Sequence, residues 1–142
     1  MFGSATPHSM KNNFSNAYRE VSVQTGVLNA SPHQLVLMLF DGFLESVSRA
    51  RGAIAAQNIE LKCQSIIRAV RIIDEGLRTN LNLQQGGALA ADLDALYGYI
   101  MMRLTYANIH NHIAALEECS RLIEPIRNAW IAIGSSQALS AS

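Results

Sequence analysis

The sequence is poor in cysteine and lysine and has no net charge, and each of these features argues against a common functional class. Its two cysteines, Cys63 and Cys119, lie far apart, each within an apolar helical pattern. We therefore expect two reduced thiols packed as small hydrophobic side chains, with a disulfide between helices as the alternative. Eleven basic residues, only two of them lysines, balance eleven acidic ones. A formal net charge of zero favours neither nucleic acid nor an anionic membrane surface as a partner.

Long apolar runs are also missing. No stretch approaches the ~18–20 consecutive apolar residues that a membrane-spanning helix needs. The first residues do not show a basic region followed by an apolar one, which is the pattern of a signal peptide. We therefore expect a cytoplasmic protein without membrane insertion. With 142 residues, 49% of them hydrophobic, the chain is long enough to form one domain with a sizeable core.

Apolar residues recur at alternating spacings of three and four, which predicts amphipathic helices. Four such segments cover about residues 32–57, 59–80, 87–108 and 113–133. Ser31 is the expected N-cap of the first helix and Pro32 its first residue. Gly86 and Gly87 form the expected turn before the third helix. Short links between helices of this length predict an all-α, antiparallel, up-down four-helix bundle.

The flanking segments have a different composition. Residues 1–13 are small and polar and are predicted to be a disordered tail or a cloning remnant, and residues 135–142 a second disordered tail. Residues 14–30 carry isolated apolar side chains, including Tyr18, and are expected to form a mobile N-terminal arm or short helix that docks on the bundle. Pro125 lies inside the last predicted helix, where it should introduce a kink or remove a turn.

The residue patterns of bundle enzymes are missing. A di-metal site in a helical bundle needs Glu-x-x-His pairs, and no glutamate here is followed three residues later by histidine. His110 and His112 are two residues apart, so on a helix they would point to different faces. Gly86-Gly87 lacks the lysine and hydroxyl residue of a phosphate-binding loop. We therefore expect no catalytic residue, no metal and no cofactor, and a bundle enzyme is the least favoured interpretation.

The third predicted helix carries more apolar surface than one packing seam uses. One side is formed by Leu89, Leu93, Leu96, Ile100 and Ala107, and the remaining circumference carries Tyr97, Tyr99, Met101, Met102, Leu104 and Tyr106. Such a helix either has neighbours on several sides or exposes surface for a partner. One interpretation is a wide core covered by the arm, and another is a groove for an amphipathic helix of another protein. A third is a self-associating bundle that forms a homodimer through this surface.

Four blocks of residues, in order and with fitting spacing over about residues 17–130, resemble the flagellin-specific export chaperones, the FliS family. The blocks are Ala17-Tyr18; Ser31-Pro32-x-x-Leu35 with Met38-Leu39-Phe40-Asp41-Gly42; Gly86-Gly87-x-Leu89-Ala90-x-x-Leu93-x-x-Leu96-Tyr97-x-Tyr99; and Arg103-Leu104 with Ala107-Asn108, followed by Arg127-x-Ala129-Trp130. The chain departs from the family pattern at Phe40, where the family usually has tyrosine, at Asp92 and Gly98, and at Pro125, which is unusual for the last helix. These departures leave the apolar pattern intact.

The resemblance implies a cytoplasmic chaperone that uses no ATP. Its client, the protein that it binds, would be flagellin, held by the disordered C-terminal segment in about a one-to-one complex. The chaperone would prevent premature polymerisation and deliver flagellin to the flagellar type III export apparatus. The export gate and other flagellar regulators are further implied partners.

The resemblance also suggests residue roles. The hypothetical client-binding residues are Tyr18, Leu93, Leu96, Tyr97, Ile100, Met101, Leu104 and Asn108; the structural residues are Ser31, Pro32, Gly86, Gly87 and Trp130. Asn108 is in addition the expected cap of the third helix, and Trp130 is expected to be a core anchor. Which of the apolar residues face the core and which face the client stays open at this point.

Overall fold

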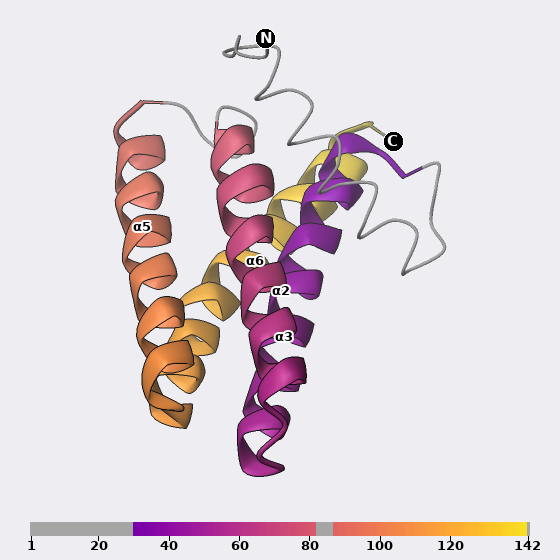
Figure 1. Ribbon diagram of the computed structural model, residues 1–142. Helices are drawn as coiled ribbons and strands as arrows, with labels where there is room; N and C mark the ends of the chain where they lie inside the picture. The colour runs from indigo at the N-terminus through magenta and orange to yellow at the C-terminus, as the bar shows by residue number, and fades with distance from the viewer. Residues whose placement is uncertain (1–29, 82–86, 142) are drawn as a thin grey trace, which may run out of the picture.

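The computed structural model describes residues 30–81 and 87–141, with side chains described as far as Gly134, and all regular structure in these ranges is helical. The elements are α2 (Pro32–Ala55), α3 (Ile59–Arg71), the π-helical turn η1 (Ile72–Leu77), the 3-10 turn η2 (Arg78–Asn80), α5 (Gly87–His110) and α6 (Ile113–Ala141). The helices lie side by side with alternating direction (Figure 1). The predicted all-α, antiparallel four-helix bundle is confirmed.

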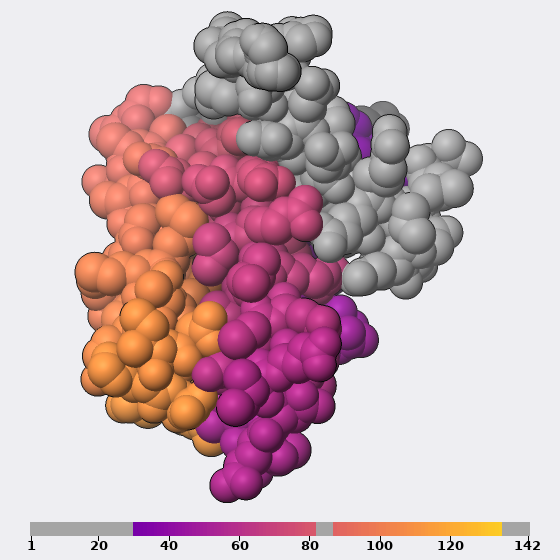
Figure 2. Space-filling model, viewed as in Figure 1, coloured from indigo at the N-terminus to yellow at the C-terminus, as the bar shows by residue number. Residues whose placement is uncertain are grey.

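Each helix packs on two others. α2 lies between α3 and α6, and α5 closes the ring by packing on α6 and α3. On the face seen in Figure 2 the side chains of α5 and α3 meet directly. Arg78 of η2 bonds to α5 by an ion pair from its Nε to an Asp94 carboxylate oxygen at 2.8 Å. Within the described residues, no helix has both the length and the apolarity needed to cross a membrane.

Ser31 begins α2 with a capping box. Its hydroxyl accepts the Gln34 N–H at 3.2 Å, while the Gln34 side-chain carbonyl accepts the Ser31 N–H at 3.0 Å. Pro32 follows at the first helical position, where the missing N–H leaves no intrahelical bond unmade. Gly87, with φ of 68°, stands at the start of α5 in a left-handed conformation that side-chain-bearing residues rarely adopt. Gly86 lies outside the described residues.

The ends of α2 and α5 are formed by residues in the left-handed conformation. Gln57 after α2 has φ of 58° and Asn111 after α5 has φ of 52°. At the second of these ends the His112 N–H donates to the Ala107 carbonyl at 3.1 Å, the long bond of a Schellman motif. The prediction that Asn108 caps this helix is therefore wrong. Asn111 takes that place, because asparagine tolerates positive φ better than most residues.

The last helix is longer than predicted. α6 continues through Pro125, so the proline removes no turn, and it reaches Ala141 instead of ending near residue 133. The backbone of residues 135–141 is thus helical where the composition suggested a disordered tail. Extending a helix that is already formed needs no new nucleus, and serine, glutamine, alanine and leucine are all compatible with it. The predicted tail 1–13 and nearly all of the predicted arm 14–30 lie outside the described residues.

The core fills the space between the helices with apolar side chains. The largest fully buried members are Tyr97, Phe40, Phe43, Leu39, Ile72, Ile73, Leu77, Ile100, Leu104, Leu116 and Ile123. Each such side chain contributes roughly 1.5–3 kcal/mol through removal from water. Cys119 is also fully buried, and Cys63 is half-buried; both thiols are free, so the interhelical disulfide is excluded.

Candidate functional site

An apolar groove lies between α5 and α6, in the half of the bundle away from the turn that joins them. Leu89 and Leu93 form the α5 wall, and Pro125, Ile126, Ala129, Trp130 and Ile133 form the α6 wall over the buried ring of Phe40 from α2. The groove has a volume of about 250 Å³. Leu89 is 49% exposed and Ile133 38% exposed. Because apolar residues line it throughout, the groove fits an apolar partner better than it fits water or a charged ligand.

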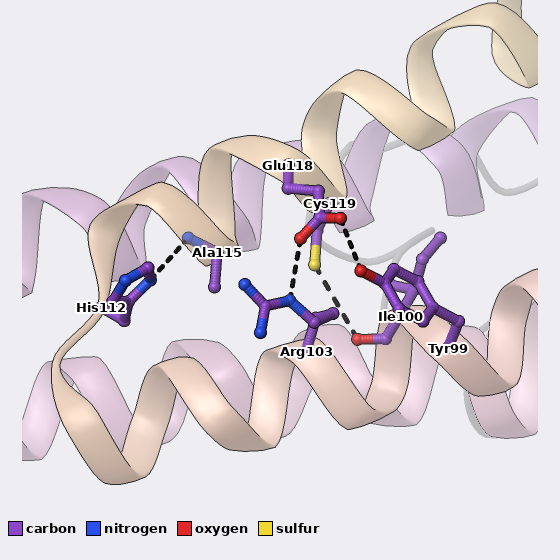
Figure 3. A network of polar contacts seen from close by, with 7 residues as sticks. All are labelled: Tyr99, Ile100, Arg103, His112, Ala115, Glu118 and Cys119. Carbon is purple, nitrogen blue, oxygen red and sulfur yellow. Dashed lines mark hydrogen bonds and ion pairs between the residues drawn. The ribbon is translucent and has the colours of Figure 1, made fainter.

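The first half of α6 is bonded to α5. Both oxygens of the Glu118 carboxylate accept from α5: Oε1 from the Arg103 Nε–H at 2.8 Å and Oε2 from the Tyr99 hydroxyl at 2.6 Å (Figure 3). Beside them the Cys119 thiol donates to the Ile100 carbonyl at 3.8 Å, and His112 Nδ1 accepts the Ala115 N–H at the start of α6. The bonds of Glu118 and Cys119 hold the two helices together below the groove.

The second half of α6 is bonded to α2 instead. Arg127 forms an ion pair with Asp41. Trp130 and His33 make a reciprocal pair: the rings stack with centroids 4.4 Å apart, the Trp130 indole N–H donates to the His33 carbonyl at 2.9 Å, and His33 Nε2 lies 2.7 Å from the Trp130 carbonyl. With these different partners, α5 and α6 lie close together at the turn that joins them and far apart at their other ends (Figure 1). The groove occupies the place where α6 leaves α5.

The titratable groups between α5 and the first half of α6 have structural roles. Hydrogen bonds from Tyr99 and then Arg103 lower the pKa of Glu118, so it is ionised at neutral pH. The same bond to Glu118 raises the pKa of Tyr99, so its phenol stays protonated. Burial raises the pKa of the Cys119 thiol to about 12, which leaves almost no thiolate for nucleophilic attack. In the part of the chain that the structure describes, no cluster of three His, Cys, Asp or Glu side chains could hold a metal ion.

The structure separates the apolar α5 residues that the sequence left unsorted. Tyr97, Ile100 and Leu104 are fully buried and belong to the core. Leu93, Leu96 and Met101 are half-buried against it. Of the predicted client-binding residues that the structure describes, Leu93 alone lines the groove. Tyr18 lies outside the described residues.

Two of the remaining predicted residues have clear structural contacts. Asn108 is half-buried: its carbonyl accepts the Lys62 ammonium at 2.8 Å, and its side-chain oxygen accepts the Cys63 thiol at 3.6 Å. Lys62 itself is 7% exposed and also donates to Asn111 Oδ1 at 2.6 Å. Trp130 is likewise 7% exposed, and it both anchors the core and forms part of the groove wall.

Sequence reasoning missed the α6 wall of the groove. The groove residues Ile126, Ala129 and Ile133 lie on α6. The apolar residues of this helix form two stripes along its surface, more than one packing seam needs. This surplus could have indicated that one stripe is available to a partner. The choice between stripes depends on where neighbouring helices lie, and spacing along one helix does not contain that information.

A helical bundle with an apolar groove between two of its helices has the architecture of a protein-binding module. The family is then shown by sequence comparison: a family model described as "Flagellar protein FliS" matches residues 14–137. The chain belongs to the FliS family of flagellar secretion chaperones.

Relatives of this chain come from several bacteria. The flagellar secretion chaperone FliS of Salmonella typhimurium is 41% identical over 114 residues, which cover 80% of this chain and 84% of the relative. FliSB of Pseudomonas aeruginosa is 40% identical over 113 residues, covering 80% of this chain and 89% of the relative. FliS of Bacillus subtilis is 36% identical over 114 residues, covering 80% of each chain. The matched regions therefore include most of the bundle.

Proposed function

We propose that this chain binds the C-terminal segment of flagellin in the groove between α5 and α6, in about a one-to-one complex in the cytoplasm. It prevents flagellin from polymerising too early and delivers it to the flagellar type III export apparatus, and it catalyses no reaction. Family membership supports a flagellar client. The observation that carries the binding mode is a groove lined throughout by apolar side chains that none of the described residues fills.

The geometry favours an amphipathic helix as the ligand. The α6 residues at the groove, Ile126, Ala129 and Ile133, are spaced by three and four, so they present a straight apolar edge along about two turns. A client helix laid along this edge would insert its own side chains at similar spacing. Each apolar side chain that becomes fully buried contributes roughly 1.5–3 kcal/mol. A client that is disordered beforehand offsets part of this gain by its ordering cost, which keeps the complex releasable.

The residue roles in this proposal follow from burial. Leu89, Leu93 and Ile133 contact the client, and Trp130 supports the groove from beneath. The fully buried Tyr97, Ile100 and Leu104 act through the core. We further propose that the arm of residues 14–30, which includes Tyr18, covers the groove until a client displaces it. The chain enters α2 close to the groove, because His33 of the first turn of α2 stacks on Trp130.

The test uses a peptide with the last ~40 residues of flagellin from the same organism, mixed with the full-length protein. The proposal predicts a one-to-one complex by light scattering, and more helicity than the two separate circular dichroism spectra added together. If the peptide neither co-migrates nor gains helix, the proposed function is wrong.

A pair of variants localises the binding. Ile133→Asp places a carboxylate at the groove, where Ile133 is 38% exposed. It should weaken peptide binding by tenfold or more, since a contact of roughly 1.5–3 kcal/mol is lost. The matched control is Ile67→Asp on α3, because Ile67 is 56% exposed and lies away from the groove. Equal weakening by both variants would exclude the groove as the binding site.

The alternative function, self-association without a client, has one observation in its favour. Tyr99, Met102, Tyr106 and Ile109 are all exposed on α5, at spacings of three, four and three that make one outward stripe. At 1.5 Å per residue the stripe is roughly 15 Å long, which is short for the ~800 Å² per partner of a standard interface. A stable dimer in light scattering of the protein alone, unchanged by the peptide, would favour this alternative.

A further inference from the structure

Pro125 stands at the point where α6 changes its bonding partner. The last side chains before it that bond to α5 are Glu118 and Cys119, and the first after it that bond to α2 are Arg127 and Trp130. Pro125 itself is exposed and lines the groove opposite the α5 wall. The helix is continuous through this position.

A proline on this side of the helix has a defined mechanical effect. It has no N–H to donate to the carbonyl of Arg121, four residues earlier, and its ring needs the space in which that carbonyl would otherwise lie. The face that carries the proline is therefore lengthened, and the helix bends away from that face. Because Pro125 lines the groove, a bend at this position would direct the second half of α6 away from α5.

We propose that Pro125 is a positioning residue that sets the width of the groove; this inference rests on the proposed function. The bend separates Ile126 and Ala129 from Leu89 and Leu93, which would otherwise pack against one another and close the groove. The contacts of the second half of α6 with α2, made by Arg127 and Trp130, hold the bent path in place. The resulting opening accommodates the side chains of a client helix.

Two substitutions separate the shape effect from simple contact. Pro125→Ala restores the backbone N–H and removes apolar contact area, whereas Pro125→Leu restores the N–H and adds apolar area. Both should raise the melting temperature by several degrees, because a strained helical position becomes a regular one, and both should weaken binding of the flagellin peptide by about tenfold. The matched control is Asn128→Ala, an exposed position one turn further along α6 that improves helix propensity without touching the groove.

A contact role would give a different pattern. Peptide affinity of Pro125→Leu equal to or greater than that of the wild-type protein would overturn the proposal, and so would a fall in melting temperature for Pro125→Ala. If the wild-type protein does not bind the peptide, the proposed function has failed, and the inference on groove width is then decided by a measurement without a client.

That measurement is the distance between α5 and α6 in the free protein. Spin labels are attached to cysteines introduced by Ala91→Cys and Ala132→Cys, at exposed positions on α5 and α6. The background variant is Cys63→Ser, in which the buried Cys119 stays unlabelled. Pulsed electron spin resonance should give a shorter mean distance in Pro125→Ala and Pro125→Leu than in the parent, and no change in Asn128→Ala. An unchanged distance in both proline variants would show that Pro125 does not open the groove.

Discussion

Gly134 lies against the His33 ring on the inner side of α6, so a side chain at this position should disturb the packing of α6 on α2. A Cβ at this position would be 2.2 Å from His33 Cε1, 2.7 Å from Nε2 and 2.8 Å from Nδ1. Carbon atoms in favourable contact are about 3.5–4.0 Å apart, so the ring and the new methyl group cannot both keep their places. We therefore expect Gly134→Ala to expel His33 from its stack on Trp130.

The magnitude follows from opposing contributions. Alanine in a helix interior is more favourable than glycine by about 1 kcal/mol. Against this, His33 loses its stacking on Trp130, worth about 0.5–1.5 kcal/mol, and its hydrogen bond to the Trp130 carbonyl, worth about 1 kcal/mol. The net result is a destabilisation of about 1 kcal/mol, which corresponds to a fall in melting temperature of about 4 °C for a bundle of this size.

The assay is thermal and urea unfolding followed by circular dichroism. Gly52→Ala serves as the control, since a Cβ at this exposed position in α2 meets no atom within 4 Å and should stabilise the protein. In a His33→Ala background the obstacle is gone, and Gly134→Ala should then also be stabilising. The reasoning is refuted if Gly134→Ala raises the melting temperature of the otherwise wild-type protein.

Three further predictions concern polar groups. Lys62→Met should lower the free energy of unfolding by about 1–3 kcal/mol in urea titration, because the Asn111 side-chain oxygen and a carbonyl of the last turn of α5 lose their donor; an unchanged midpoint would contradict this. Hydrogen bonds lower the pKa of Glu118 in the folded protein, so they add stability above its unfolded pKa of about 4.3, and this stability is lost as the pH falls through the lower folded pKa. The free energy of unfolding of Glu118→Gln should therefore depend less on pH below about 4.5 than that of the wild-type protein. Identical pH dependence of the two proteins in acid would show that this carboxylate does not contribute. Because burial raises the pKa of Cys119 to about 12, iodoacetamide at about pH 8 should modify it only on unfolding, as mass spectrometry can measure, whereas reaction of native Cys119 as fast as Cys63 would contradict its burial.

Much of the fold could be predicted because it depends on local chemistry. The start of α2 at Ser31 and Pro32 follows from a capping residue and a proline that are adjacent in the chain. The boundaries that were missed depend on small differences in backbone free energy. Asn111, not Asn108, adopts the left-handed conformation at the end of α5, and α6 continues past both Pro125 and Gly134. From composition alone, proline and glycine are predicted to end a helix. In α6, packing against α2 and α5 stabilises the helix by more than the free energy that these two residues cost it.

The candidate site could be predicted only in part. The surplus of apolar residues on the third predicted helix correctly indicated surface beyond one seam, and Leu93 is indeed at the groove. The same reasoning placed Tyr97, Ile100 and Leu104 beside it as client-binding candidates, and these side chains are fully buried. Periodicity identifies which residues share a helix face, but it does not say how many neighbours cover that face.

The sequence by itself determined the helical class of this protein, the long helices of residues 30–81 and 87–141, and its family, because spacing, capping and motif order are properties of the chain alone. Only the tertiary structure decided which apolar residues are available to a partner. The groove exists because α6 bonds to α5 before Pro125 and to α2 after it. The contacts of α6 with α2, Asp41 with Arg127 and His33 with Trp130, join residues that are far apart in the sequence. Contacts between such residues are set by packing in three dimensions.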